Sequence, residues 1–79
     1  MVDAKDLLEL MTKALVDNPD TVEVTEAEED GETVLEIHVD PEDVGKIVGR
    51  EGRTVRALRT IMDAAGKKYG RQFAVEVIE

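Results

Sequence analysis

The pattern of apolar and polar positions changes its period several times along the chain. In residues 3–19, apolar side chains recur every three or four positions, which predicts an amphipathic helix with Asp3 as its N-cap. The predicted buried stripe of this helix consists of Leu7, Leu8, Met11, Ala14 and Leu15. The pair Asn18-Pro19 ends the helix, because the residue before a proline avoids helical backbone angles.

Residues 21–39 alternate with a period of two, which is typical of strands that bury one face. The alternating apolar residues are Val22, Val24, Leu35, Ile37 and Val39. Asp30-Gly31 lies between the two runs and favours a tight turn, so the segment predicts a β-hairpin. The acidic run 26–32 is expected to be its solvated end, and His38 is expected to be a surface or edge residue.

A short helix is predicted after the hairpin. Asp40 suits its N-cap and Pro41 its first position, and the helix is expected to run to about Val48. The acids Glu42 and Asp43 suit the positive end of this helix.

A longer helix and a last strand complete the pattern. The buried stripe predicted for the helix is Val55, Leu58, Ile61, Met62 and Ala65. The helix is expected to end between Gly66 and Gly70, and residues 71–79 predict a strand with Phe73, Val75 and Val77 on one face.

The predicted order of elements is α-β-β-α-α-β. Two helices separate the second strand from the third, a crossover long enough for parallel pairing. Three helices packed on one face of a three-stranded mixed sheet give an α+β two-layer sandwich. The chain of 79 residues is expected to form a single domain over residues 1–79.

Charge divides the chain into two unequal parts. The net charge is −9, yet residues 46–71 hold eight lysines and arginines against Glu51 and Asp63, a net +6, which leaves −15 on the rest. This local asymmetry indicates one anion-binding region on an acidic protein. The chain has no cysteine or serine and only one histidine, so we expect no enzyme, no cofactor and no metal site. No apolar run approaches membrane-spanning length and no signal peptide is recognised, so a cytoplasmic location is expected.

The positive region contains the segment "IVGREGRTV" at residues 47–55. Gly49 and Gly52 could simply end one helix and begin the next. The segment is not a Walker loop, because the Gly-Lys-Ser/Thr ending is absent. However, Arg53 and Thr54 follow at a helix N-terminus, where free N–H groups and the helix dipole favour an anion.

The run of residues 44–58, "VGKIVGREGRTVRAL", resembles the signature of a KH domain, in which a G-x-x-G loop clamps the backbone of about four nucleotides. The element order resembles the bacterial type II arrangement, and the whole chain resembles the small stand-alone KH proteins of the KhpA family. The resemblance implies an RNA-binding site formed by Lys46, Ile47, Val48, Gly49, Arg50, Glu51, Gly52, Arg53, Thr54 and Arg56. Glu51 departs from a basic loop, because its charge offsets that of Arg50.

The resemblance implies a protein that holds single-stranded RNA weakly, as an RNA chaperone or a post-transcriptional regulator. It also implies a homodimer, or a heterodimer with a second KH-domain protein of the KhpB or Jag-like kind, and no membrane partner. Two alternatives stay open. One is a protein-interaction or dimerisation module with little RNA affinity, and the other is a helix-turn-helix DNA-binding protein, since two helices joined by a short turn also fit that motif.

Overall fold

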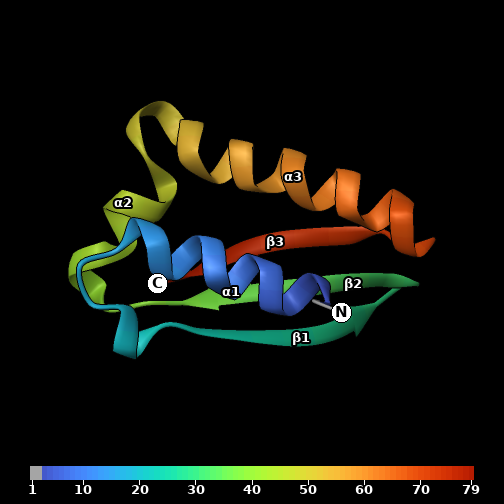
Figure 1. Cartoon of the computed structure of the whole chain (residues 1–79), viewed down its shortest axis with the longest axis horizontal. Coiled ribbons are helices and arrows are strands. Elements are labelled where there is room, and N and C mark those ends of the chain that lie inside the picture. Colours follow the sequence, from blue (N-terminus) through green and yellow to red (C-terminus); the bar gives the residue numbers. More distant parts are fainter. Residues whose placement is uncertain (1–2) are drawn as a thin grey trace.

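The computed structural model describes residues 3–79 and has the predicted order α-β-β-α-α-β (Figure 1). The helices are α1 (Ala4–Leu15), α2 (Val44–Val48) and α3 (Arg53–Tyr69), and the strands are β1 (Glu23–Glu29), β2 (Glu32–His38) and β3 (Phe73–Ile78). Single 3₁₀ turns cover Pro19–Thr21, Pro41–Asp43 and Arg50–Gly52. The predicted α+β fold class is confirmed.

The sheet has the order β1-β2-β3 and is mixed, as predicted. Strand β1 is antiparallel to β2, whereas β3 is parallel to β2 because α2 and α3 form the crossover between them. Asp30 and Gly31 both have positive φ, of 51° and 80°. Two adjacent left-handed residues are what a tight hairpin turn requires, so the predicted turn is confirmed.

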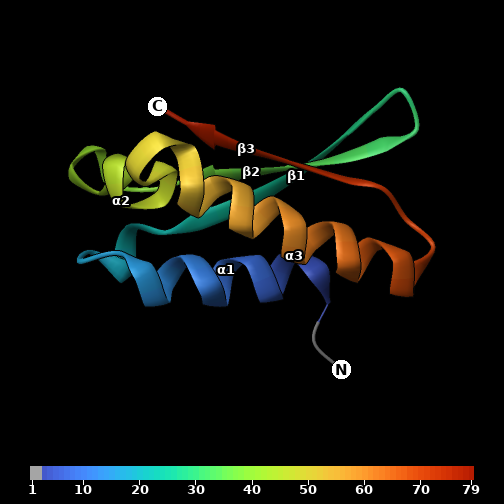
Figure 2. The ribbon, with the colours of Figure 1, turned by 90° about the horizontal axis from the view of Figure 1, so that it is seen from above.

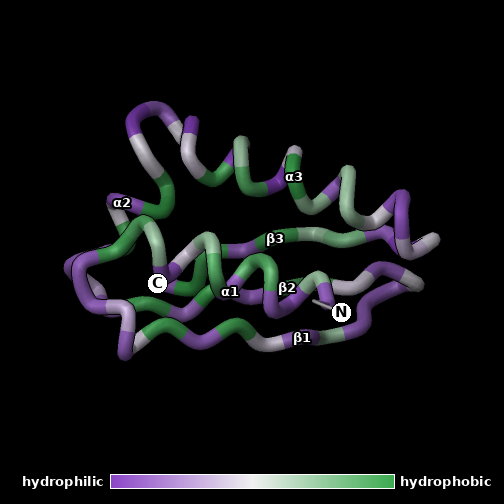
Figure 3. The backbone as a smooth tube through the Cα atoms, viewed as in Figure 1, coloured by the Kyte–Doolittle hydropathy of each residue, from purple (hydrophilic) through white to green (hydrophobic). Residues whose placement is uncertain are grey.

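Helices α1 and α3 lie on the same side of the sheet, and the short α2 lies beside the start of α3 at one end of the molecule (Figure 2). Hydrophobic and hydrophilic residues alternate along β1 and β2, as the sequence pattern predicts (Figure 3). The most deeply buried apolar side chains come from both layers and are Leu8, Val24, Leu35, Ile37, Ile47 and Met62. Each such side chain contributes roughly 1.5–3 kcal/mol by leaving water.

Parts of the predicted helix stripes are wrong. Leu15 and Ile61 are 43% and 44% exposed, and Ala14 is exposed as well. These side chains lie on the flanks where α1 and α3 face each other across an open apolar groove, rather than over the sheet. Thr12 is buried in α1 instead, because its hydroxyl donates to the Leu8 carbonyl at 2.7 Å and needs no water.

The predicted helix ends are largely confirmed. The Asp3 carboxylate accepts from the Asp6 amide at 2.9 Å, and the Asp40 carboxylate accepts from the Glu42 amide at 2.9 Å. Helix α3 ends at the left-handed Gly70. Gly66 is a buried residue inside the helix, where an added Cβ would lie 2.4 Å from the Arg71 carbonyl oxygen. Gly66 therefore allows the start of β3 to approach α3 closely.

Candidate nucleic-acid interface

The glycine loop joins α2 to α3 at the end of the molecule opposite the hairpin turn (Figure 1). The amide of Gly49 donates to the Gly45 carbonyl at 2.9 Å and closes α2. The amide of Gly52 donates to the Gly49 carbonyl at 3.1 Å, and α3 begins at the next residue, Arg53. The loop is thus a single tight turn set directly on the N-terminus of a 17-residue helix.

Both glycines of the loop are required by its geometry. Gly49 has φ 76° and ψ 172°, a conformation open almost only to glycine, and an added Cβ would lie 2.3 Å from Thr54 Oγ1. Gly52 is left-handed, with φ 73° and ψ 16°. Glu51 between them is also left-handed, with φ 57°, which is uncommon for a residue with a side chain. The loop therefore turns sharply, with no side chain where Gly49 approaches α3.

Helix α3 begins beside this loop without a side-chain N-cap, and the helix dipole is positive there. The Arg53 amide donates to the Arg50 carbonyl, so the amides of the first turn beyond Arg53 are the candidate donors to an anion. The Arg56 guanidinium reaches back from the second turn and donates to the Gly52 carbonyl at 3.3 Å and to the Glu51 carbonyl. Arg56 thus holds the shape of the loop rather than projecting away from it.

The exposed charges of the loop are not equivalent. Within residues 3–79, the Arg50 side chain makes no hydrogen bond or ion pair, and it is exposed. Arg53 lies 3.6 Å from the Glu51 carboxylate, and both side chains are exposed. Arg50 is therefore the loop cation that is free to meet an anion, whereas Arg53 is partly neutralised by Glu51.

The three predicted site residues of α2 lie in different surroundings. Ile47 is fully buried and belongs to the hydrophobic core. Val48 is half-buried, as is Thr54 on α3. The Lys46 ammonium lies 3.2 Å from Asp17 and 3.4 Å from Asp43, within a cluster of carboxylates.

Asp43 lies outside the predicted site, and the sequence pattern indicates only that its negative charge suits the positive end of a helix. The structure buries its side chain completely. Burial by itself raises the pKa of the Asp43 carboxyl, but hydrogen bonds from Asn18, Asp17 and Lys46 outweigh this effect and hold the pKa below its ordinary value. The Asp17 carboxylate, and then Asp43, raise the pKa of Lys46 above its ordinary value.

Arg59 is a second residue beyond the predicted site. Its Nε donates to the Val75 carbonyl at 3.2 Å, so the side chain bridges α3 and the edge strand β3. The three-residue spacing of Arg53, Arg56 and Arg59 is the sequence signal that places Arg59 on the same side of α3.

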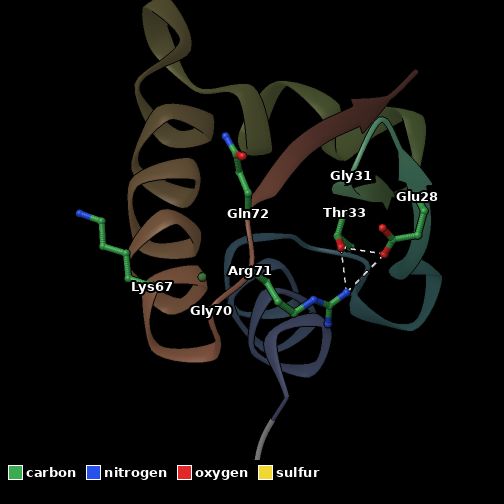
Figure 4. Close-up of a pocket in the computed structure, with 8 residues that line it drawn as sticks. Glu28, Gly31, Thr33, Lys67, Gly70, Arg71 and Gln72 are labelled. Atoms are coloured by element: carbon green, nitrogen blue, oxygen red, sulfur yellow. Dashed lines mark hydrogen bonds and ion pairs between the residues drawn. The ribbon is translucent and has the colours of Figure 1, made fainter.

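The basic residues at the other end of α3 have different partners. Arg71 donates to Thr33 Oγ1 at 2.8 Å and lies 3.4 Å from the Glu28 carboxylate, in the pocket of Figure 4. It also lies 3.6 Å from Glu26, so part of the acidic hairpin end is ion-paired.

His38 lies on the central strand rather than an edge, where Nε2 is 3.1 Å from Thr25 Oγ1. Among residues 3–79 there is no cluster of histidine and carboxylate groups suited to a metal ion.

Comparison with known proteins agrees with this geometry. The model of the KhpA/KhpB KH domain matches residues 5–77. The chain is 49% identical over 75 residues to the RNA-binding protein KhpA of Aquifex aeolicus, a match that covers 95% of each chain. It is 45% identical over 74 residues to the RNA-binding protein KhpA of Clostridium acetobutylicum, covering 94% of this chain and 99% of that protein.

Among solved structures, a variant of Aquifex aeolicus Era bound to GDP and AlF4⁻ matches 94% of this chain with a TM-score of 0.66. The identity is 19% and the match covers 29% of the Era chain, so this likeness concerns the fold alone. Within the described residues, no helix is both long and apolar enough to span a bilayer. The fold, the glycine loop and the near full-length relatives together show that the chain belongs to the KhpA/KhpB family of KH domains.

Proposed function

We propose that this protein binds single-stranded RNA through the glycine loop and the first turn of α3. The observation that carries the proposal is the unpaired, exposed Arg50 beside the α3 N-terminus, which has no side-chain cap. Relatives that match over almost their whole length are named RNA-binding protein KhpA, which supports the same ligand. Since the set of candidate catalytic groups is small, we propose a binding protein rather than an enzyme.

Each loop residue has a distinct proposed role. Gly49 and Gly52 let the phosphate backbone approach closely, and Arg50 supplies the positive charge. The backbone amide of Thr54, in the first turn of α3, donates a hydrogen bond to the phosphate at the positive end of the helix dipole. Arg56 keeps the loop rigid through its bonds to the loop carbonyls.

The affinity of this site is expected to be weak. About two or three phosphates meet the loop, so log K should fall with log salt with a slope of roughly −1.4 to −2.1. Base stacking contributes little, because the chain holds only Tyr69 and Phe73 as aromatic residues and Phe73 is buried. A weak, sequence-tolerant clamp of this kind suits an RNA chaperone or a post-transcriptional regulator that works on many transcripts.

The test replaces Arg50 and Glu51 together by aspartates and keeps both glycines. Because both side chains are exposed, the free energy of unfolding should change by no more than about 0.5 kcal/mol. RNA binding, measured by fluorescence anisotropy, should nearly vanish, because a phosphate then faces two carboxylates. The matched control is Lys67→Asp, which makes the same change of charge at the far end of α3 and should leave most of the binding. Equal loss of RNA binding in both variants would show that the total charge of the protein, and not the loop, determines binding. A preference of the wild-type protein for duplex DNA would favour the helix-turn-helix alternative.

We further propose that the chain pairs with a second KH domain, either its own copy or one of the KhpB kind. An apolar groove between α1 and α3 supports this, with the exposed Leu15 and Ile61 on its walls. Sedimentation should show that Ile61→Lys weakens self-association or pairing with a KhpB-type domain. The control Leu10→Lys, at a residue that is 64% exposed and outside the groove, should leave the association unchanged.

A further inference from the structure

Asp43 has an unusual environment for an acid next to a proposed phosphate site. Among residues 3–79, it is the only charged residue that is buried, and its side chain is fully inaccessible to solvent. A buried carboxylate is unfavourable unless hydrogen bonds and a counter-ion satisfy it. The groups that satisfy Asp43 therefore indicate what this residue does.

The donors to Asp43 come from a distant part of the sequence. Its Oδ1 accepts from the Asp17 amide at 3.2 Å, and its Oδ2 accepts from both the backbone and the side-chain amide of Asn18, each at 3.0 Å. Lys46, one turn later in α2, lies 3.4 Å from Oδ1. The carboxylate thus joins the connection between α1 and β1 to the base of α2.

A second link joins the same two segments. The hydroxyl of Thr21 accepts from the Asp40 amide at 3.2 Å and donates to the Asn18 carbonyl at 2.8 Å. The turn that leads into α2 is consequently held at both of its ends, at Asp40 and at Asp43.

Helix α2 depends on such links, because it has only five residues. An isolated helix of this length does not persist in water, so tertiary contacts must define its position. Gly49 follows the last residue of α2 directly, so the position of α2 determines the position of the glycine loop. The buried Ile47 fixes α2 from the core side, and Asp43 fixes it from the side of the α1–β1 connection.

We propose that Asp43 is a positioning residue for the glycine loop, which clamps α2 to the α1–β1 connection and keeps Lys46 as its counter-ion. The proposal rests on RNA binding by the loop. Lys46 then forms ion pairs with the buried carboxylate and with Asp17 rather than with an RNA phosphate. This differs from the RNA-binding role that the family resemblance implies for Lys46.

The lowered pKa of Asp43 agrees with this role and determines how the stability of the fold changes with pH. A carboxyl whose pKa is lower in the folded protein stabilises the fold at pH values above its ordinary pKa of 3.8. This contribution is lost as the pH falls through the pKa of the folded state. The charged group in contact with Asp43 is Lys46, which Asp17 also contacts. Acid should therefore release the clamp, and Asp43→Asn should remove this part of the acid sensitivity.

The experiment compares Lys46→Gln with Arg50→Gln, using single-stranded oligonucleotide RNA in fluorescence anisotropy over a range of salt, beside thermal melting. Lys46→Gln should lower the melting temperature and keep the wild-type salt slope. Arg50→Gln should do the opposite. It should keep the melting temperature and make the slope of log K against log salt less negative by about 0.7, the value for one phosphate on a single strand. A reduced slope with unchanged melting in Lys46→Gln would make Lys46 a phosphate ligand and overturn the proposal.

Asp43 itself is tested by Asp43→Asn and by the milder Asn18→Ala, which removes one side-chain donor and retains the backbone amide. At a temperature where each variant is fully folded, Asp43→Asn should weaken RNA binding about 3- to 10-fold and shift the NMR amide peaks of Gly49 and Gly52. Asn18→Ala should shift the same peaks less, and it replaces Asp43→Asn if that variant does not fold. Unmoved glycine peaks and unchanged affinity would show that Asp43 only stabilises the fold. If the wild type binds no RNA, the proposed function fails, whereas the glycine peaks still decide whether Asp43 positions the loop.

Discussion

The two ends of helix α3 both carry basic residues, but they differ in what surrounds those residues. At the N-terminal end, Arg50 is unpaired and lies beside the positive end of the helix dipole. At the C-terminal end, Arg71 faces two hairpin carboxylates and a threonine, and Lys67 and Lys68 lie at the negative end of the dipole. Of these two ends, as residues 3–79 show them, the N-terminal end is the one that combines an available cation with an uncapped helix N-terminus.

This difference shows that a positive stretch of sequence is not the same as a positive surface. A helix of 17 residues is about 25 Å long, so α3 carries the basic residues of one stretch to opposite ends of the molecule. The acidic hairpin then neutralises part of one end, as Figure 4 shows for Glu28 and Arg71. The net +6 of residues 46–71 therefore overstates the charge that an RNA backbone would meet.

The largest expected effect is a difference in the free energy of unfolding between substitutions of Gly49 in the loop and of Gly31 in the hairpin turn. Gly49→Ala should reduce the free energy of unfolding by roughly 2–4 kcal/mol, because it combines a strained backbone with a clash against Thr54. Gly31→Ala in the hairpin turn should cost only about 1 kcal/mol, since φ is positive there but nothing lies within 4 Å of an added Cβ. Urea unfolding measures both variants, and equal losses would mean that the close approach of Gly49 to Thr54 has no energetic consequence.

An intermediate effect is expected from the arginine of the hairpin end. Arg71→Gln removes exposed ion pairs and a contact with the Phe73 ring at 5.1 Å, so the free energy of unfolding should fall by about 1 kcal/mol. RNA affinity should remain at the wild-type value. Anisotropy and thermal melting together check this outcome. Weaker RNA binding in Arg71→Gln, similar to that in Arg50→Gln, would remove the distinction between the two ends.

The smallest expected effect concerns the acid within the loop. Glu51→Gln should tighten RNA binding about 2- to 4-fold, because it frees Arg53 from an exposed ion pair, and such pairs are worth roughly 0.2–1 kcal/mol. Glu28→Gln removes the same charge at the hairpin end and should leave the affinity unchanged. Anisotropy at low salt resolves this difference. If Glu51→Gln tightened binding equally when Arg53 was already replaced by Gln, the ion pair would not be the cause.

Much of the fold and of the candidate site could be predicted because the relevant signals are local. The periods of two and of three to four residues located the strands and the two longer helices, Asp40 and Pro41 located the short helix, and Asp30-Gly31 located the turn. Gly49 and Gly52 marked the loop, since positive φ angles restrict the residue type. The exposed Ile61 and Leu15 were predicted as buried, because the apolar stripe of a helix does not show which part of it faces the sheet and which part borders an open groove.

The elements, their order and the glycine loop can be predicted from the sequence, because backbone conformation and side-chain periodicity depend on neighbouring residues. Which charges are available depends instead on how distant segments pack together. Lys46 and Arg50 look alike in the sequence, yet Lys46 meets Asp43 and Asp17, whereas Arg50 has no side-chain partner within residues 3–79. The amide donors that hold Asp43 lie about 25 residues away along the chain. Pairing over such distances is a property of the packed fold, since local spacing places no constraint on which segments meet.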